Sequence, residues 1–124
     1  MALSLMIVDD DPQLIRVLSL FFDSEGYNVI QAADGREALM LLSEYTPDLI
    51  LLDLMMPEVG GEEVVKQVRA KYKSSRIPIV IFTAADAREE ELRTAGADTF
   101  IIKPFSLDGL RDVVHEAIRQ ASPT

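Results

Sequence analysis

Four short apolar runs in this sequence each end at a residue suited to phosphate or metal chemistry, and this pattern limits the folds available to the chain. The runs and their polar ends are Leu5–Val8 with Asp9, Asp10 and Asp11, Leu49–Leu52 with Asp53, Ile79–Phe82 with Thr83, and Phe100–Ile102 with Lys103. If the runs are parallel strands of one sheet, these polar side chains share one edge, where open α/β sheets bind ligands. We therefore expect acids, a hydroxyl and an amine to meet in one site.

The length and composition indicate one domain. The chain has 124 residues, of which 48% are hydrophobic, and this is enough for a single buried core. We expect the domain to span residues 1–124, with a folded core from about 3 to 120 and a short tail or the start of a linker at 121–124.

The charge and the missing residue types exclude several classes of protein. With 21 acidic against 12 basic residues and a net charge of −9, the domain is not expected to contact nucleic acid. The absence of cysteine excludes disulfides and thiolate ligands. No apolar stretch is long enough to span a membrane, and no signal segment is visible at the start. We expect a cytoplasmic protein whose partners are proteins and cations.

Helix signals separate the apolar runs. They are the cap Asp11-Pro12, the capping box Asp34-Gly35-Arg36-Glu37, the valines Val64, Val65 and Val68 after Gly60-Gly61, the polar segment Asp86–Arg93 ending near Gly96, and the cap Ser106. These signals predict five helices. We assign Asp11 mainly to capping, and His115, between Val114 and Glu116 on the last helix, to the surface.

Strands and helices therefore alternate five times, once a second strand is placed at Tyr27–Ala32. This alternation indicates a parallel sheet covered by helices on both faces. The uniformly apolar runs at 49–52 and 79–82 suit the centre, whereas the mixed segment 27–31 suits an edge. We predict an α/β fold of the flavodoxin-like (βα)5 type, a three-layer sandwich with a parallel five-stranded sheet in the order 2-1-3-4-5.

That strand order brings the carboxylates of Asp9, Asp10 and Asp53 to the crevice between the first and third strands. Such acids repel one another unless a cation compensates, and Mg²⁺ is suited to a site with few carboxylates. Asp53 is the single acid at its strand end, so we assign it the attack on phosphorus that forms an acyl phosphate. Lys103 would balance the charge of the transferred group, and Thr83 would hydrogen-bond one of its oxygens.

Several motifs then show a resemblance to a known family. They are Val8-Asp9-Asp10-Asp11, the stretch from Pro47-Asp48 through Asp53 to Met56-Pro57 with Gly61, Phe82-Thr83-Ala84, Gly96-Ala97-Asp98, and Lys103-Pro104-Phe105. In this order and on these predicted strands, the chain resembles a response-regulator receiver domain from Leu3 to about Gln120, nearly its whole length.

The resemblance implies roles for the acidic residues. Asp53 is similar to the phospho-acceptor of the family. Asp9 and Asp10 are similar to its acidic pair, with Asp10 bound directly to Mg²⁺ and Asp9 bound through water. The backbone carbonyl of Met55 stands where the family has its third protein ligand.

It also implies a switch. Thr83 is similar to the family's switch hydroxyl, Lys103 to its lysine, and Phe100 to its switch aromatic residue, which is commonly Tyr. The peptide bond between Lys103 and Pro104 is cis in such folds. On this reading, Thr83 moves toward the phosphoryl group, Phe100 fills the vacated space, and the surface of the fourth helix, fifth strand and fifth helix changes for a partner.

The function implied is a phosphorylation-activated signalling switch. Its phosphoryl donor would be the phosphohistidine of a sensor histidine kinase or a phosphotransfer protein, and its output an attached domain or a protein effector. It would catalyse only its own phosphorylation and dephosphorylation, so it is not expected to be an enzyme acting on a diffusible substrate. Val113 stands where receivers with winged-helix outputs usually have a basic residue, and both a monomer and a phosphorylation-dependent dimer stay open.

Two other functions are compatible with the same residues. A small aspartyl-phosphate phosphohydrolase also combines an aspartate nucleophile with Thr and Lys, but it usually has a second acid two residues later, where this chain has Met55. A binding module that keeps the fold without being phosphorylated usually lacks one of the acids, Thr or Lys, and none is missing here.

Overall fold

The sheet has the predicted order. The computed structural model describes residues 2–54, 56, 59–71, 77–83, 96–102 and 106–121, and in these residues five parallel strands are arranged as β2-β1-β3-β4-β5. The strands are β1 (Ser4–Val8), β2 (Asn28–Ala32), β3 (Leu49–Asp53), β4 (Ile79–Thr83) and β5 (Thr99–Ile102). The flavodoxin-like prediction is confirmed, and the first and third strands are neighbours as expected.

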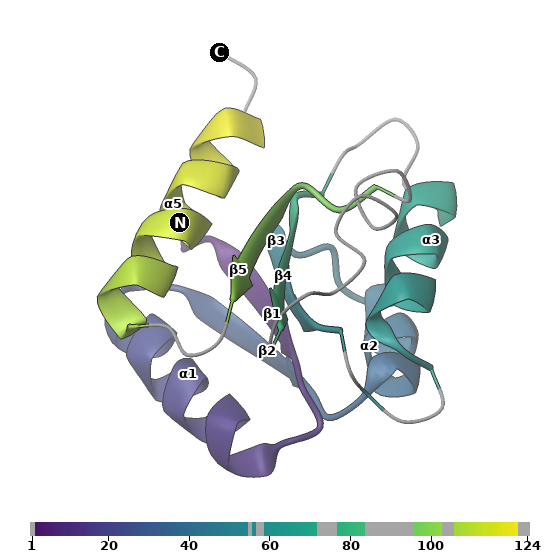
Figure 1. Ribbon diagram of the computed structural model, residues 1–124, viewed down its shortest axis with the longest axis horizontal. Coiled ribbons are helices and arrows are strands. Elements are labelled where there is room, and N and C mark those ends of the chain that lie inside the picture. Colours follow the sequence, from purple (N-terminus) through teal and green to yellow (C-terminus); the bar gives the residue numbers. More distant parts are fainter. Residues whose placement is uncertain are drawn as a thin grey trace.

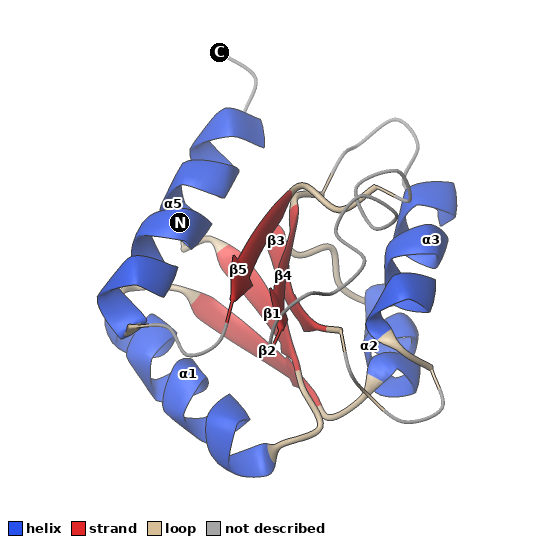
Figure 2. Cartoon of the chain, viewed as in Figure 1, coloured by secondary structure: helices blue, strands red, loops and turns tan. Residues whose placement is uncertain are grey.

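Helices cover both faces of this sheet. Those described are α1 (Pro12–Ser24), α2 (Gly35–Leu42), α3 (Gly61–Lys71) and α5 (Leu107–Ala121). Helices α1 and α5 lie on one face, and α2 and α3 lie on the other (Figure 1). The coloured elements in Figure 2 show the resulting helix, sheet and helix layers. The helix predicted at residues 86–93 lies outside the described residues.

Burial explains the strand order. Every residue of β3 and β4 is buried, whereas β2 and β5 are only partly buried. One apolar cluster fills the space between the sheet and α2 and α3, and a second lies under α1 and α5. A strand with apolar side chains toward both clusters belongs in the centre, as predicted for β3 and β4.

The strand ends differ slightly from prediction. Asp53 and Thr83 are the last residues of β3 and β4 and do not follow them, because the ladder continues through the pairs Asp53↔Phe82 and Thr83↔Ile102. The second strand begins at Asn28, one residue later than predicted, and the fifth begins at Thr99, one residue earlier. The functional side chains are therefore held by strand pairing.

The predicted caps are confirmed, with one change. The Asp11 side chain accepts the N–H of Gln13 at 3.0 Å and starts α1, whose first residue is Pro12. At α2, Asp34 accepts the Glu37 N–H at 2.8 Å, as a capping box requires. The Glu37 carboxylate, however, accepts the N–H of Ala33 at 2.6 Å, one residue before the cap, and so reaches back into the loop after β2.

The structure also bears on membrane insertion. Within the described residues, none of the helices combines the length and the apolar character that crossing a bilayer demands.

Candidate functional site

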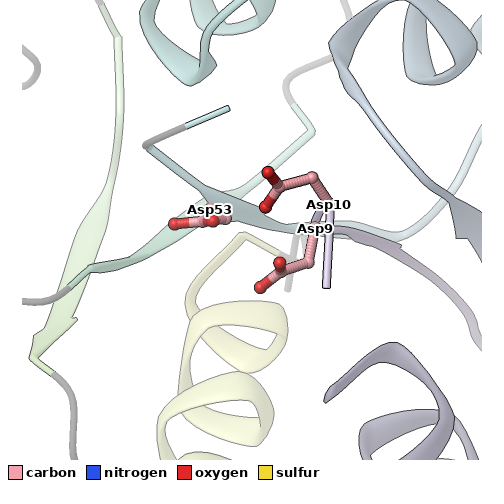
Figure 3. Close-up of side chains that lie close together, drawn as sticks. All are labelled: Asp9, Asp10 and Asp53. Carbon is pink, nitrogen blue, oxygen red and sulfur yellow. The ribbon is translucent and has the colours of Figure 1, made fainter. Parts of the chain in front are cut away.

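Three carboxylates meet at the ends of β1 and β3. Val8 pairs with Leu52, so Asp9 and Asp53 follow at the same level of the sheet. Candidate ligand oxygens of Asp9, Asp10 and Asp53 all lie within 4.8 Å of one another. Figure 3 shows the three side chains gathered at this strand edge. The structure thus brings together the acids that the sequence placed at the crevice.

These acids differ in their exposure. Asp9 is 1% exposed and Asp53 is 5% exposed, whereas Asp10 is open to solvent. Asp9 accepts the backbone N–H of Asp11 at 2.8 Å through Oδ1. Its own N–H donates to Ala32 of β2 at 3.2 Å. The turn from β1 into α1 is therefore fixed by hydrogen bonds, and it presents two acids side by side.

The backbone of Asp53 is packed closely against the start of α3. A Cβ placed on Gly61 would lie 2.7 Å from the Asp53 carbonyl oxygen and 2.9 Å from the Leu54 Cα. The Gly61 N–H donates to the Leu54 carbonyl oxygen at 3.1 Å. Any side chain at position 61 would push against the backbone that carries Asp53. The sequence showed Gly61 only as part of a motif, without a role.

The start of α2 also packs closely against the segment between β3 and α3. A Cβ on Gly35, the first residue of α2, would overlap the carbonyl oxygen of Val59. The start of α2 therefore touches the segment between β3 and α3. Sequence reasoning missed this contact, because Gly35 looked only like the first residue after a cap.

The donor set fits a small divalent cation. Three carboxylates, two of them buried, place up to three negative charges within a few ångströms, and carboxylate oxygens are the ligands that Mg²⁺ prefers. Mutual repulsion would disfavour this arrangement without a compensating positive charge. Within the described part of the chain, this is the one cluster of acids and histidines close enough to hold a metal ion.

Thr83 and Phe100 lie on the strands next to β3. Thr83 is 4% exposed and ends β4 one position beyond the level of Asp53, since Asp53 pairs with Phe82. Phe100 pairs with Ile81 and is half-buried against the cluster under α2 and α3. The structure brings Thr83 to the same edge as the acids, whereas Phe100 lies two positions back along its strand.

Two predicted site residues, Met55 and Lys103, lie outside the described residues, as does Pro104. Their roles stay predictions. Lys103 follows Ile102 in the sequence, and Ile102 pairs with Thr83 at the end of β5.

The single histidine is on the surface, as expected. His115 is exposed on α5 and lines a surface cavity of about 570 Å³ with Glu25, Tyr27 and Arg111. Burial, together with the nearby Glu25 carboxylate, raises the pKa of the Tyr27 phenol. This cavity shares no residue with the acidic cluster.

The comparisons with known proteins agree with this geometry. The family model described as the response regulator receiver domain matches residues 5–115. The chain belongs to this family. Among curated relatives, this receiver domain is 37% identical to response regulator MprA of Mycolicibacterium vanbaalenii over 125 residues, which cover 99% of this chain and 53% of that protein. It spans about half the length of the curated relatives it matches.

Solved structures also resemble the receiver domain. Chemotaxis protein CheY4 of Vibrio cholerae has a TM-score of 0.87 and 30% identity, over 94% of this chain and 99% of that one. The receiver domain of sensor histidine kinase PA1611 from Pseudomonas aeruginosa has a TM-score of 0.85 and 26% identity, over 96% and 99% of the two chains. That structure has a magnesium ion coordinated in its active-site cleft.

Family membership establishes the general function. This is a receiver domain of two-component signalling, and it acts as a phosphorylation-dependent signalling switch.

Proposed function

We propose that this receiver domain accepts a phosphoryl group on Asp53 in a Mg²⁺-dependent reaction, and that the modification changes a surface read by an output partner. The observation that carries the proposal is the position of Asp53. It ends a fully buried central strand, and its carboxylate lies within reach of Asp9 and Asp10. A nucleophile held by strand pairing and close packing keeps a fixed position, as in-line attack requires.

The phosphoryl transfer forms one bond to phosphorus and breaks another. A carboxylate oxygen of Asp53 forms a new O–P bond while the P–N bond of the donor phosphohistidine breaks, and that electron pair stays on the imidazole nitrogen. Hydrolysis later adds water to phosphorus and breaks the O–P bond, which restores the carboxylate and releases inorganic phosphate. The domain returns to its starting state, so it catalyses only its own modification.

The metal-holding residues are Asp9 and Asp10, with Asp53 and the backbone carbonyl of Met55. Asp10 would bind Mg²⁺ directly and Asp9 through water. When bound, Mg²⁺ neutralises charge on the phosphoryl oxygens and on the clustered carboxylates. Asp9 is further held by the Asp11 N–H, which keeps its carboxylate aimed at the cluster.

Thr83 and Lys103 would bind the transferred group. Charge-assisted hydrogen bonds of this kind are worth roughly 1.5–3 kcal/mol each. Moving a two-state equilibrium from about 1:99 to 99:1 takes about 5.5 kcal/mol. The two hydrogen bonds together are comparable with the free energy that this shift requires, which supports a large shift in population. Thr83 would move toward the phosphoryl group, and Phe100 would fill the space it leaves.

The surface expected to change is formed by β5, α5 and the predicted fourth helix. Its reader would be an output domain or a protein effector, and the donor a sensor histidine kinase or a phosphotransfer protein. The net charge of −9 supports protein partners and no nucleic acid contact by this domain. We place it in the cytoplasm, where such kinases present their phosphohistidine. The oligomer would be a monomer or a phosphorylation-dependent dimer.

Labelling with acetyl phosphate tests the proposal. The wild-type domain should take up one phosphoryl group in the presence of Mg²⁺ and almost none when EDTA removes it. Asp53→Asn should abolish the label. Asp48→Asn is the matched control, since Asp48 precedes the same strand at its other end and should leave labelling intact. Full labelling of Asp53→Asn would overturn the assignment.

Turnover separates the switch from a phosphohydrolase. Incubated with a panel of phosphomonoesters, the domain should release no more than a trace of phosphate, because the proposed reaction modifies the domain itself and does not turn over a diffusible substrate. Sustained multiple turnover on any of them would favour the hydrolase. Absence of any label under all conditions would favour the unphosphorylated binding module.

A further inference from the structure

Arg69, near the end of α3, binds three groups at the amino-terminal edge of the sheet. Its Nε donates to the Gly96 carbonyl oxygen at 2.9 Å and its Nη1 to the Ile77 carbonyl oxygen at 2.6 Å. Its Nη2 donates to the Asp98 carboxylate at 2.7 Å. The Arg69 side chain is only 15% exposed. Because the guanidinium is a rigid fork, it holds these three groups in one arrangement.

Asp98 is at the same time joined to the start of β4. Its N–H donates to the Ile79 carbonyl oxygen at 3.0 Å. Its Oδ2, the oxygen bound by Arg69, also accepts the Ile79 N–H at 2.8 Å. Asp98 is thereby fixed beside Ile79, and the next pair along the ladder is Val80 with Thr99.

The strand that follows contains little to fix its own register. Among the described strands, β5 is an edge strand of four residues that pairs with β4 alone. Its residues Phe100, Ile101 and Ile102 are all apolar. A slip by one residue would exchange Phe100 and Ile101 between the two faces, and because both side chains are apolar, polar and apolar alternation opposes the slip only weakly. A contact outside the strand therefore adds to what sets the register.

The register of β5 determines which residue follows the strand at the edge of the sheet where the acids lie. Ile102 pairs with Thr83, and Lys103 is the next residue in the sequence. A slip by one residue would shift the chain by about 3.3 Å. A misplacement of about 1 Å in an active site can slow a reaction about 100-fold.

We propose that Arg69 is a positioning residue for phosphoryl transfer, because it fixes Asp98 and thereby the register that delivers Lys103 to the site. This role rests on the proposed function of the domain. Arg69 acts from the far end of β5, roughly 13 Å away for four strand residues of about 3.3 Å each. It touches none of the three acids in the described structure.

Gly96 supports the same assignment. Its φ of +124° lies in the left-handed region, and a Cβ there would come within 2.5 Å of the Arg69 Cγ. The Arg69 side chain lies across this turn because Gly96 has no side chain. Gly96→Ala is therefore a second way to disturb the hydrogen bonds of Arg69 with Gly96, Ile77 and Asp98, without removing a charge.

The test compares two readouts in the same variants. In Arg69→Met, labelling by acetyl phosphate at saturating Mg²⁺ should slow by about tenfold or more. Mg²⁺ affinity, measured by calorimetry, should stay within about twofold, since Asp9 and Asp10 follow β1 and Asp53 ends β3, away from Arg69. Arg69→Lys should also be slow, because one ammonium cannot replace the three-way fork. A labelling rate within twofold of wild type in both variants would overturn the role.

Two matched controls separate positioning from general damage. Lys66→Met removes a charge one turn earlier on α3, where Lys66 makes an exposed pair with Glu62 at 3.2 Å, and it should label normally. Asp48→Ala removes the same kind of bond, which the Ser4 N–H donates to the Asp48 carboxylate at 2.7 Å. Asp48, however, precedes β3, and β3 has a neighbouring strand on each side. Asp48→Ala should label normally, while Asp98→Ala should be slow. Equal slowing in Asp48→Ala and Asp98→Ala would contradict register control.

A milder variant keeps the test decisive if Arg69→Met does not fold. Asp98→Asn retains an acceptor for the Ile79 N–H and removes the negative charge that faces Arg69, and it should slow labelling with Mg²⁺ affinity unchanged. The outcomes also separate the two proposals. If wild-type protein takes no label on Asp53, the proposed function fails; if it is labelled and the Arg69 variants match it, only the positioning role fails.

Discussion

Gly61 lies so close to Asp53 that a Cβ at position 61 would come within 2.7 Å of the Asp53 carbonyl oxygen. The neighbour is backbone, which cannot turn aside like the end of a flexible side chain. Gly61→Ala should therefore shift the end of β3, lower the free energy of unfolding by about 1–3 kcal/mol and slow labelling of Asp53. Urea unfolding and acetyl phosphate labelling measure the two effects.

Gly60 provides the control for this substitution. Its nearest heavy atom to an added Cβ is the Leu54 carbonyl oxygen at 3.7 Å, an ordinary contact distance. Gly60→Ala should change stability and labelling little. If Gly61→Ala behaved like Gly60→Ala in both measurements, close packing would not be what holds Asp53 in place.

Asp10 is expected to bind the metal, whereas its neighbour Asp11 caps α1. Asp10→Ala should weaken Mg²⁺ binding by about tenfold or more, since even groups one shell away from a metal contribute about 10–100-fold. Asp11→Ala should leave Mg²⁺ affinity near wild type and lower the free energy of unfolding by about 1 kcal/mol. Calorimetric titration reports the affinities, and an unchanged value for Asp10→Ala would remove that residue from the metal site.

Ser19 offers a stability test away from the site. Its hydroxyl is buried on α1 and has no hydrogen-bond partner among the described residues. Ser19→Ala should leave stability unchanged or raise it by up to about 1 kcal/mol, because it removes an unsatisfied polar group and improves helix propensity. Ser106 is the opposite case, since its Oγ accepts the Gly109 N–H at 2.9 Å. Ser106→Ala should therefore lower the free energy of unfolding by about 1 kcal/mol. Urea midpoints that fall equally in both would contradict this.

Tyr27 makes stability depend on pH at the alkaline end. Its pKa is raised above the ordinary value of 10.0 by burial and by Glu25. As pH rises past that value, the unfolded chain loses this proton first, so the free energy of unfolding declines until the folded pKa is passed. Below about pH 9 both states are protonated and the contribution is constant.

The measurement compares unfolding of wild type and Tyr27→Phe by urea between about pH 9 and pH 11. Wild type should lose more stability across this range than Tyr27→Phe. Tyr45→Phe, which changes a side chain that is 49% exposed, should follow wild type. Equal slopes for wild type and Tyr27→Phe would show that burial of the Tyr27 phenol has no effect on folding.

Much of the fold could be predicted because local signals agreed with the global arrangement. The runs at 49–52 and 79–82 have no polar alternation, and only central strands can bury both faces. The cap at Asp11 and the box at Asp34 mark helix starts by side chains that bond their own neighbours. From the strand order, the meeting of Asp9, Asp10 and Asp53 followed directly.

The supporting contacts could not be predicted, because they join residues far apart in sequence. Arg69 lies one turn after Lys66 on a polar helix face, where the sequence alone shows it as an ordinary solvated charge. Its partner Asp98 is 29 residues away. Likewise, the need for glycine at position 61 depends on how closely α3 approaches the backbone of Asp53, and this distance is a property of the folded chain.

The central claim is that the acyl phosphate forms on residue 53, and chemical mapping tests it most directly. Borohydride reduces an aspartyl phosphate to homoserine, so the domain is incubated with acetyl phosphate and Mg²⁺, reduced, digested and sequenced by mass spectrometry. We predict homoserine at position 53, with Asp9 and Asp10 unchanged. Homoserine at position 9 or 10, or intact aspartate at position 53 in a fully labelled sample, would contradict the account.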